Sequence, residues 1–168
     1  SLDGLWQFHP GDDPRWADPA FDDSAWPLLR SDRPWSVQGY PGMSGYAWYR
    51  FTLRAPAGSP PVSLLLPPIT SGYTLYVDGR NAGSAGNSDP QLFIRYPQSQ
   101  SFHLTTVSDP APRTLHLALR VWHSPIWASY VGAGPLPAFP AWPGTPICWL
   151  SSNMIACKTR LYGISTFM

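Results

Sequence analysis

Glutamate is absent from this sequence of 168 residues, and its acidic residues are all aspartates. Because glutamate is a strong helix former, a helix-rich protein is an unusual place for it to be missing. Charged residues make up only 12% of the chain, and the formal net charge is +1, with no run of one sign. We therefore expect no surface suited to nucleic acid or to an anionic membrane.

Long apolar runs are also missing, so no transmembrane helix and no membrane insertion are expected. The sequence opens on Ser-Leu-Asp-Gly rather than on a signal peptide. This start fits a mature extracytoplasmic domain, periplasmic or secreted, which we take as the expectation, although a trimmed cytosolic chain would look the same. The only cysteines, Cys148 and Cys157, would close a small loop in an oxidising compartment or stay unpaired.

Proline, glycine and tryptophan are abundant, with 21, 14 and 9 copies. This composition is typical of a loop-rich β-protein that carries an aromatic surface. A hydrophobic share of 43% supplies the apolar area that disordered chains lack. The length suits a single domain.

Alternating apolar and polar residues predict short strands at residues 5–8, 48–53, 62–66, 73–77, 91–96, 101–104 and 114–122. In the last segment, the residues expected to face inward are Leu115, Leu117, Leu119 and Val121. Residues 62–66, apolar apart from Ser63 and bounded by Pro67-Pro68, predict a strand that is buried on both faces or lies at the centre of a sandwich. Asp78-Gly79 predicts a tight hairpin turn. The fold class that follows is all-β, an antiparallel β-sandwich or jelly roll over residues 1–131, followed by a proline-rich tail or strap, residues 132–168, of undetermined structure.

A series of motifs occurs in a characteristic order: Leu5-Trp6-Gln7-Phe8, Gly11-Asp12, Trp16-Ala17, residues 21–26, Trp35, Trp48-Tyr49-Arg50, residues 76–80 and Gly83. The series resembles the galactose-binding-domain-like jelly roll. More narrowly, it is similar to the sugar-binding domain that precedes the catalytic barrel of family 2 glycoside hydrolases. Related modules occur as extracytoplasmic sensor domains of bacterial kinases and phosphatases. The resemblance covers about residues 4–131 and implies a non-catalytic module whose catalytic carboxylates would lie in another domain.

Residues 11–26, GDDPRWADPAFDDSAW, concentrate aspartate and tryptophan and allow three interpretations. A catalytic pair of carboxylates is disfavoured, because aspartates beside proline and serine usually accept backbone hydrogen bonds, which lower their pKa. A structural calcium ion at Asp12, Asp22 and Asp23 is the second interpretation, since clustered carboxylates supply the oxygens that calcium requires and many galactose-binding-like modules carry such an ion. The favoured interpretation is a capped helical turn at residues 21–26, with Phe21 and Trp26 packed on the sandwich.

Two loop segments combine aromatic and hydrogen-bonding side chains, as carbohydrate sites do. The candidate ligand-binding residues are Trp35, Gln38, Tyr40, Tyr46, Trp122, His123 and Trp127. Core packing is the alternative for each tryptophan, and we prefer it for Trp6, Trp26 and Trp48. Arg50 and Arg120 alternate onto outward faces, where a salt bridge to an aspartate is expected.

No metal-ligand histidine spacing, nucleophile elbow or phosphate-binding loop is found in the sequence. The leading hypothesis is therefore a non-catalytic carbohydrate-binding module of a larger extracytoplasmic protein, either a sensor or a glycoside hydrolase accessory domain. A downstream catalytic or membrane domain would be its partner, and apart from calcium no cofactor is expected. The alternatives are a structural packing domain without a small ligand and, third, a stand-alone glycoside hydrolase. The sequence does not specify the sugar.

Overall fold

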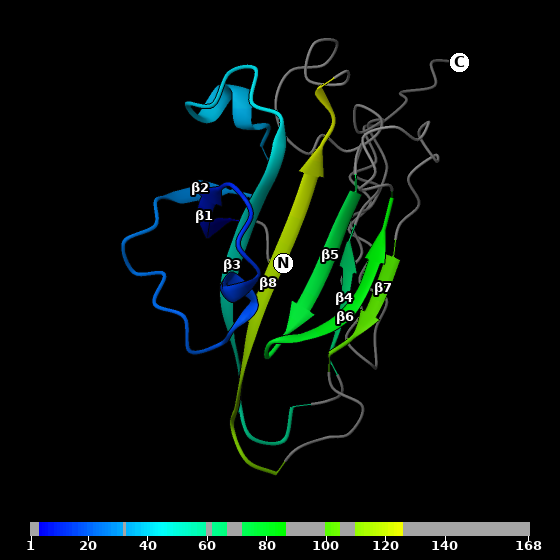
Figure 1. The fold of residues 1–168 in the computed structure, drawn as a ribbon. Helices are drawn as coiled ribbons and strands as arrows, with labels where there is room; N and C mark the ends of the chain where they lie inside the picture. The colour runs from blue at the N-terminus through cyan, green and yellow to red at the C-terminus, as the bar shows by residue number, and fades with distance from the viewer. Residues whose placement is uncertain are drawn as a thin grey trace, which may run out of the picture.

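The computed structural model describes residues 4–31, 33–59, 62–66, 72–86, 100–104 and 110–125. The strands are β1 (Leu5–Pro10), β2 (Leu28–Arg30), β3 (Gly45–Ala55), β4 (Ser63–Leu66), β5 (Gly72–Val77), β6 (Arg80–Ala85), β7 (Gln100–His103) and β8 (Arg113–His123). Two 3-10 helices, η1 (Pro14–Ala17) and η2 (Trp35–Gln38), interrupt the loops. The strands form an antiparallel sheet in the order β2-β1-β3-β8-β5-β6 and a second antiparallel pair, β4-β7 (Figure 1). The all-β antiparallel fold class is confirmed.

The long strands β3 and β8 form the centre of the larger sheet. They pair from Gly45 opposite His123 to Ala55 opposite Arg113, along the full length of both strands. The predicted alternation in β8 is confirmed, because the four residues expected to face inward are buried. Pairing in one register over this length places alternate side chains of both strands on the same face of the sheet. The period-2 pattern of both strands supplies apolar side chains for that face.

The core lies between the two sheets. Leu64, Leu66 and Phe102 of the smaller sheet belong to the same buried cluster as Tyr73 and Leu75 of β5. Figure 1 shows β4 and β7 beside β5 and β6, on one side of the larger sheet. We call the face of the larger sheet that contacts β4 and β7 the inner face, and the opposite one the outer face.

The hairpin between β5 and β6 forms at the predicted position. Asp78 and Gly79 both have positive φ angles, 48° and 77°, which matches the two-residue turn that suits twisted hairpins. Asp78 also accepts a hydrogen bond from the backbone N–H of His116 at 2.8 Å. The turn is therefore anchored to β8 as well as being locally favoured.

Residues 62–66 depart from their prediction, because β4 starts at Ser63 and alternates between half-buried and buried residues. Burial on both faces is therefore wrong, since the residues that alternate with the buried Leu64 and Leu66 are only half-buried; the alternative, a strand at the centre of a sandwich, is not contradicted. Strand β7 corresponds to the predicted strand 101–104. The strand predicted at 91–96 and the tail 132–168, with Cys148 and Cys157, lie outside the described residues.

The jelly-roll connectivity and the domain boundary at residue 131 stay predictions. Residues 87–99 and 105–109, which lie between described strands, are outside the described residues. Within the described ranges, no helix has the length and apolar character needed to cross a membrane.

Candidate functional site

The long connection from β1 to β2, residues 11–27, lies across the outer face of the larger sheet; we call it the crossing loop. It starts with η1, where Asp13 caps the first turn by accepting a hydrogen bond from the N–H of Arg15 at 2.9 Å. Its middle reaches the β5–β6 turn, because a Cβ atom on Gly79 would lie 3.1 Å from Pro19 Cδ. The helical turn expected at residues 21–26 is therefore wrong: the helical turn is η1, and Trp26 closes a simple turn onto the carbonyl of Asp23.

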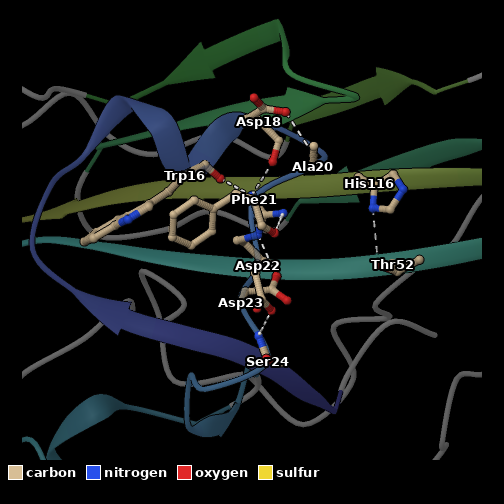
Figure 2. Close-up of polar contacts among 10 residues, drawn as sticks. Trp16, Asp18, Ala20, Phe21, Asp22, Asp23, Ser24, Thr52 and His116 are labelled. Atoms are coloured by element: carbon tan, nitrogen blue, oxygen red, sulfur yellow. Dashed lines mark hydrogen bonds and ion pairs between the residues drawn. The ribbon is translucent and has the colours of Figure 1, made fainter.

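Arg50 holds the crossing loop against the sheet, although its strand position faces away from the core. Its Nε donates to Asp23 Oδ2 at 2.6 Å, and Nη1 donates to the carbonyl oxygens of Trp16 and Asp18. Its Nη2 donates to the carbonyl oxygen of Phe21 at 3.3 Å (Figure 2 shows these loop residues). The Arg50 side chain is only 5% exposed. The predicted salt bridge is confirmed, and a single planar cation organises the loop backbone around itself.

Aromatic rings fill the space between the crossing loop and the sheet. Trp48 is fully buried; Tyr76 stacks against it at 5.4 Å and Trp16 meets it edge-on at 6.1 Å. Trp26 packs on Trp16 and on His9, with ring centroids 5.1 and 4.9 Å apart. The packing roles preferred for Trp26 and Trp48 are thus confirmed, and the outer face carries a second, smaller apolar layer beneath the loop.

Every aspartate among the described residues has a hydrogen-bonding partner. Asp18 accepts from the N–H of Ala20 and Asp22 from the N–H of Ser24, at 2.9 and 3.0 Å (Figure 2). These bonds from Ser24 lower the pKa of Asp22. The other four pair with arginine or a distant backbone N–H: Asp12 with Arg120, Asp13 with Arg15, Asp23 with Arg50 and Asp78 with His116. A general acid for glycoside hydrolysis needs a raised pKa, whereas hydrogen bonds lower the pKa values of Asp12, Asp13 and Asp22.

The calcium hypothesis finds no support in the described residues. Asp12, Asp22 and Asp23 point to three separate partners instead of converging, and no group of three His, Cys, Asp or Glu side chains there is arranged to hold a metal. The reason is that Arg120 and Arg50 supply the positive charge that a cation would otherwise supply.

Trp35 and His123 are not surface ligands, which corrects the prediction for both. Each is fully buried, and their rings meet at 5.8 Å on the inner face. The Trp35 indole N–H donates to the Tyr49 hydroxyl at 2.6 Å. Burial raises the pKa of Tyr49, so its hydroxyl stays protonated. The glycine-rich loop suggested exposure, but η2 turns Trp35 into the core.

Gln38 and Tyr40 also have structural roles. The Gln38 carboxamide accepts from the N–H of Arg30 at 2.8 Å and donates to the carbonyl of the same residue at 3.0 Å. It thereby imitates a neighbouring strand at the edge of β2. Tyr40 packs on Phe8 at 5.1 Å and is half-buried against the core.

Tyr46 and Trp122, which come from the two separate candidate segments, lie side by side. They lie opposite each other on β3 and β8, their rings are 4.7 Å apart, and both are half-buried on the outer face. The guanidinium of Arg120 stacks on the Tyr46 ring at 3.8 Å. Arg120 in turn makes its predicted salt bridge, to Asp12. We call Tyr46, Trp122, Arg120 and Asp12 the aromatic platform. Trp127 lies outside the described residues.

Comparison with known proteins places this fold. Neither known family models nor curated proteins match the sequence. Solved structures do: Bacteroides uniformis β-glucuronidase 2, with a TM-score of 0.56 and 27% identity, is matched over 73% of this chain and 14% of that chain. A second structure of a Bacteroides uniformis β-glucuronidase matches over the same shares, with a TM-score of 0.57 and 25% identity. A glycosyl hydrolase family 2 member from Bacteroides cellulosilyticus DSM 14838 has a TM-score of 0.56 and 22% identity over 73% of this chain and 17% of that one.

This chain has the fold of a domain of family 2 glycoside hydrolases. The GH2-like domain thus corresponds to a small part of the enzymes that it resembles, and the resemblance seen in the sequence motifs is confirmed.

Sequence reasoning missed two features of the GH2-like domain. It placed Arg50 on an exposed face, because nothing local shows that the crossing loop returns over β3. It considered Asp12 as a turn, catalytic or metal residue, whereas the Asp12 carboxylate accepts hydrogen bonds from Arg120 and from the Trp48 indole N–H, 108 and 36 residues away in the sequence. The available signal was the coincidence of outward-facing arginines with a loop rich in aspartate.

Proposed function

We propose that this chain is a non-catalytic carbohydrate-binding domain of a larger glycoside hydrolase related to family 2. The observation that carries the proposal is the aromatic platform, in which Tyr46 and Trp122 lie 4.7 Å apart beside Arg120. Aromatic rings bind the apolar C–H faces of sugars, and neighbouring polar groups bind the hydroxyls. The proposal that the larger protein is a glycoside hydrolase rests on the structural similarity to β-glucuronidases. Their catalytic activity is not assigned to this chain.

A catalytic role for the described part of this domain has no chemical support. Glycoside hydrolysis requires two facing carboxylates, one with a raised pKa. In this domain the hydrogen bonds of Arg120, Arg15 and Ser24 lower the pKa values of Asp12, Asp13 and Asp22, respectively. These carboxylates stay ionised at neutral pH and cannot act as proton donors.

The test is titration of the 168-residue chain with a panel of glycosides, first on a glycan array and then by calorimetry. Trp122→Ala should abolish binding or weaken it roughly tenfold, since losing one stacked ring costs about 1–1.5 kcal/mol. Trp26→Ala is the matched control, because Trp26 is also half-buried on the outer face but packs on His9 instead of on the platform. Equal affinity of Trp122→Ala and the unchanged chain would contradict the platform as the binding site.

A purely structural packing role is the second candidate. Leu5 and Leu28 are 54% and 55% exposed, and they occupy diagonal positions on β1 and β2, on the outer face. Such an apolar edge suits contact with another domain of the same protein. If no glycoside binds, and if Leu28→Arg weakens association with a separately produced remainder of the protein, this alternative replaces the first. An extracytoplasmic location is proposed with either role.

A further inference from the structure

We propose that Asp12 makes the aromatic platform selective for uncharged sugars over acidic ones by neutralising Arg120. The inference rests on the proposed function, because it names the class of carbohydrate that the same site accepts. It concerns a residue that the sequence analysis considered for a turn, a catalytic pair or a calcium ion, and not for selecting a sugar.

The Asp12–Arg120 pair is fixed by several contacts. Arg120 Nε donates to Asp12 Oδ1 at 2.7 Å and Nη2 donates to Oδ2 at 2.5 Å, a bidentate arrangement. Trp48 Nε1 adds a hydrogen bond to Oδ1 at 3.1 Å. The Tyr46 ring supports the guanidinium from one side at 3.8 Å. Because planar bidentate pairs are geometrically specific, both charged groups are held in place before a ligand arrives.

Both members of the pair keep hydrogen-bonding capacity for a ligand. The Arg120 side chain is 26% exposed and that of Asp12 is 30% exposed. No hydrogen bond from Arg120 Nη1 is found within the described ranges, and a carboxylate oxygen can accept more than one hydrogen bond. A donor beside an acceptor, next to aromatic rings, matches adjacent hydroxyl groups on a neutral sugar ring.

The two charges of the platform are balanced, whereas Asp18 and Asp22 of the crossing loop accept hydrogen bonds from backbone N–H groups and keep their negative charge. Asp12 and Arg120 cancel each other, and the other ion pairs near the crossing loop, Asp13 with Arg15 and Asp23 with Arg50, are balanced as well. A sugar carboxylate would have to compete with Asp12 for Arg120 and would approach an existing anion. Repulsion from Asp12 therefore offsets the attraction of the guanidinium.

Two glycosides that differ in a single group test the inference. Methyl β-glucoside carries a hydroxymethyl group where methyl β-glucuronide carries a carboxylate. Calorimetric or NMR titration of the 168-residue chain should show glucoside binding at least as tight as glucuronide binding. Asp12→Asn keeps the shape but leaves Arg120 uncompensated, so glucuronide affinity should rise roughly three- to tenfold at low salt and lose this gain at high salt.

Asp13→Asn is the matched control, because it removes the same charge from the neighbouring residue, whose carboxylate pairs with Arg15. Its glucuronide affinity should stay within about twofold of that of the unchanged chain, because solvent and salt screen an exposed charge. Arg120→Gln provides the mirror image, since it leaves Asp12 uncompensated and should weaken glucuronide binding more than glucoside binding. Thermal unfolding of each variant establishes that it is folded.

The outcomes separate the two proposals. Tighter glucuronide than glucoside binding by the unchanged chain overturns the inference and leaves carbohydrate binding in place. Equal shifts in Asp12→Asn and Asp13→Asn overturn it too, as does an Arg120→Gln chain that binds both glycosides equally. Absence of binding of either glycoside to all four proteins overturns the inference, and it overturns the proposed function as well when the glycoside panel also shows no binding.

Discussion

Arg50 occupies a strand position that faces away from the core, yet its guanidinium is withdrawn from water by the crossing loop. Desolvation of a cation is costly unless its N–H groups find acceptors. Here one carboxylate and three backbone carbonyls of the loop accept them, from Asp23, Trp16, Asp18 and Phe21. The arginine side chain thus supplies donors to loop carbonyls, in addition to the local turn hydrogen bonds of residues 16–21.

Arg50→Lys should destabilise the chain by about 1–3 kcal/mol, because lysine keeps the charge but has no planar fork to reach several carbonyls. Urea unfolding followed by circular dichroism measures the change. Arg54→Lys is the matched control, since Arg54 lies on the same strand and is exposed; its effect should stay within about 0.5 kcal/mol. Equal stability of the two variants would contradict the role given to Arg50.

Stability should fall in acid through Asp12, Asp13 and Asp22. Hydrogen bonds from Arg120, Arg15 and Ser24 hold their folded-state pKa values below the ordinary 3.8. A depressed folded pKa gives stability that is complete above the unfolded pKa and is lost as the pH falls toward the folded one. The urea midpoint should therefore be flat near neutral pH and should decline below about pH 5.

Asp12→Asn should flatten part of this decline, because an amide does not titrate there. The measurement is the urea midpoint of both proteins across the acidic range. A decline that is unchanged in Asp12→Asn would show that other groups control acid unfolding.

At the scale of elements, the close approach of the two sheets limits which side chains the β5–β6 hairpin can carry. A Cβ atom on Gly83 would lie 2.8 Å from Cε1 of the Phe102 ring on β7, and the φ angle of Gly83 is 145°. A side chain here would meet both an aromatic ring and an unfavourable backbone conformation. Glycine at this position allows the smaller sheet to pack against β6.

Gly83→Ala should cost about 1–3 kcal/mol through overpacking. Thermal unfolding measures it, with Ala82→Ser as the control on an exposed position of the same strand. Adding Phe102→Leu to Gly83→Ala should recover part of the loss, because the shorter side chain gives space to the new methyl group. Failure of the double variant to recover any stability would place the cost in the backbone rather than in the contact.

At the scale of the whole molecule, the crossing loop should detach from the sheet only when the sandwich unfolds. Arg15 is the exposed basic residue in the loop, at 82%, and is therefore a tryptic site. Its neighbour Trp16 is held through its carbonyl by Arg50 and through its ring by Trp48. A protease needs an extended segment, so cleavage after Arg15 requires the loop to leave the sheet.

Trypsin should cut after Arg15 only as fast as global unfolding allows, with a urea dependence equal to that of equilibrium unfolding. In Arg50→Lys, cleavage at this site should become faster and less dependent on urea, because the loop then opens locally. Mass spectrometry of the fragments assigns the site, and Arg15→Gln removes it. Rapid, urea-independent cleavage in the unchanged chain would contradict a single cooperative unit.

Some features followed from local patterns. Residues 115–121 alternate strictly, so β8 and its inward face were predictable, and Asp78-Gly79 favours its turn through the φ angles that both residues tolerate. Trp35 and His123 were not predictable in the same way. Their neighbours are polar, glycine-rich or proline-rich, and their burial depends on a contact with each other across 88 residues of chain.

The strand periodicity and the turn chemistry of this chain are local properties, and they were sufficient to predict an all-β antiparallel fold. The resemblance to family 2 glycoside hydrolases came instead from the ordered series of motifs between residues 5 and 83. Which aromatic side chains remain accessible is a different kind of property. On the outer face it depends on where the crossing loop lies, which is set by contacts of Arg50 and Arg120 with aspartates far away in the sequence. On the inner face it depends on η2, which brings Trp35 against His123. Burial results from many long-range contacts acting together. Only the tertiary structure therefore distinguishes the half-buried Tyr46 and Trp122 from the buried Trp35 and His123.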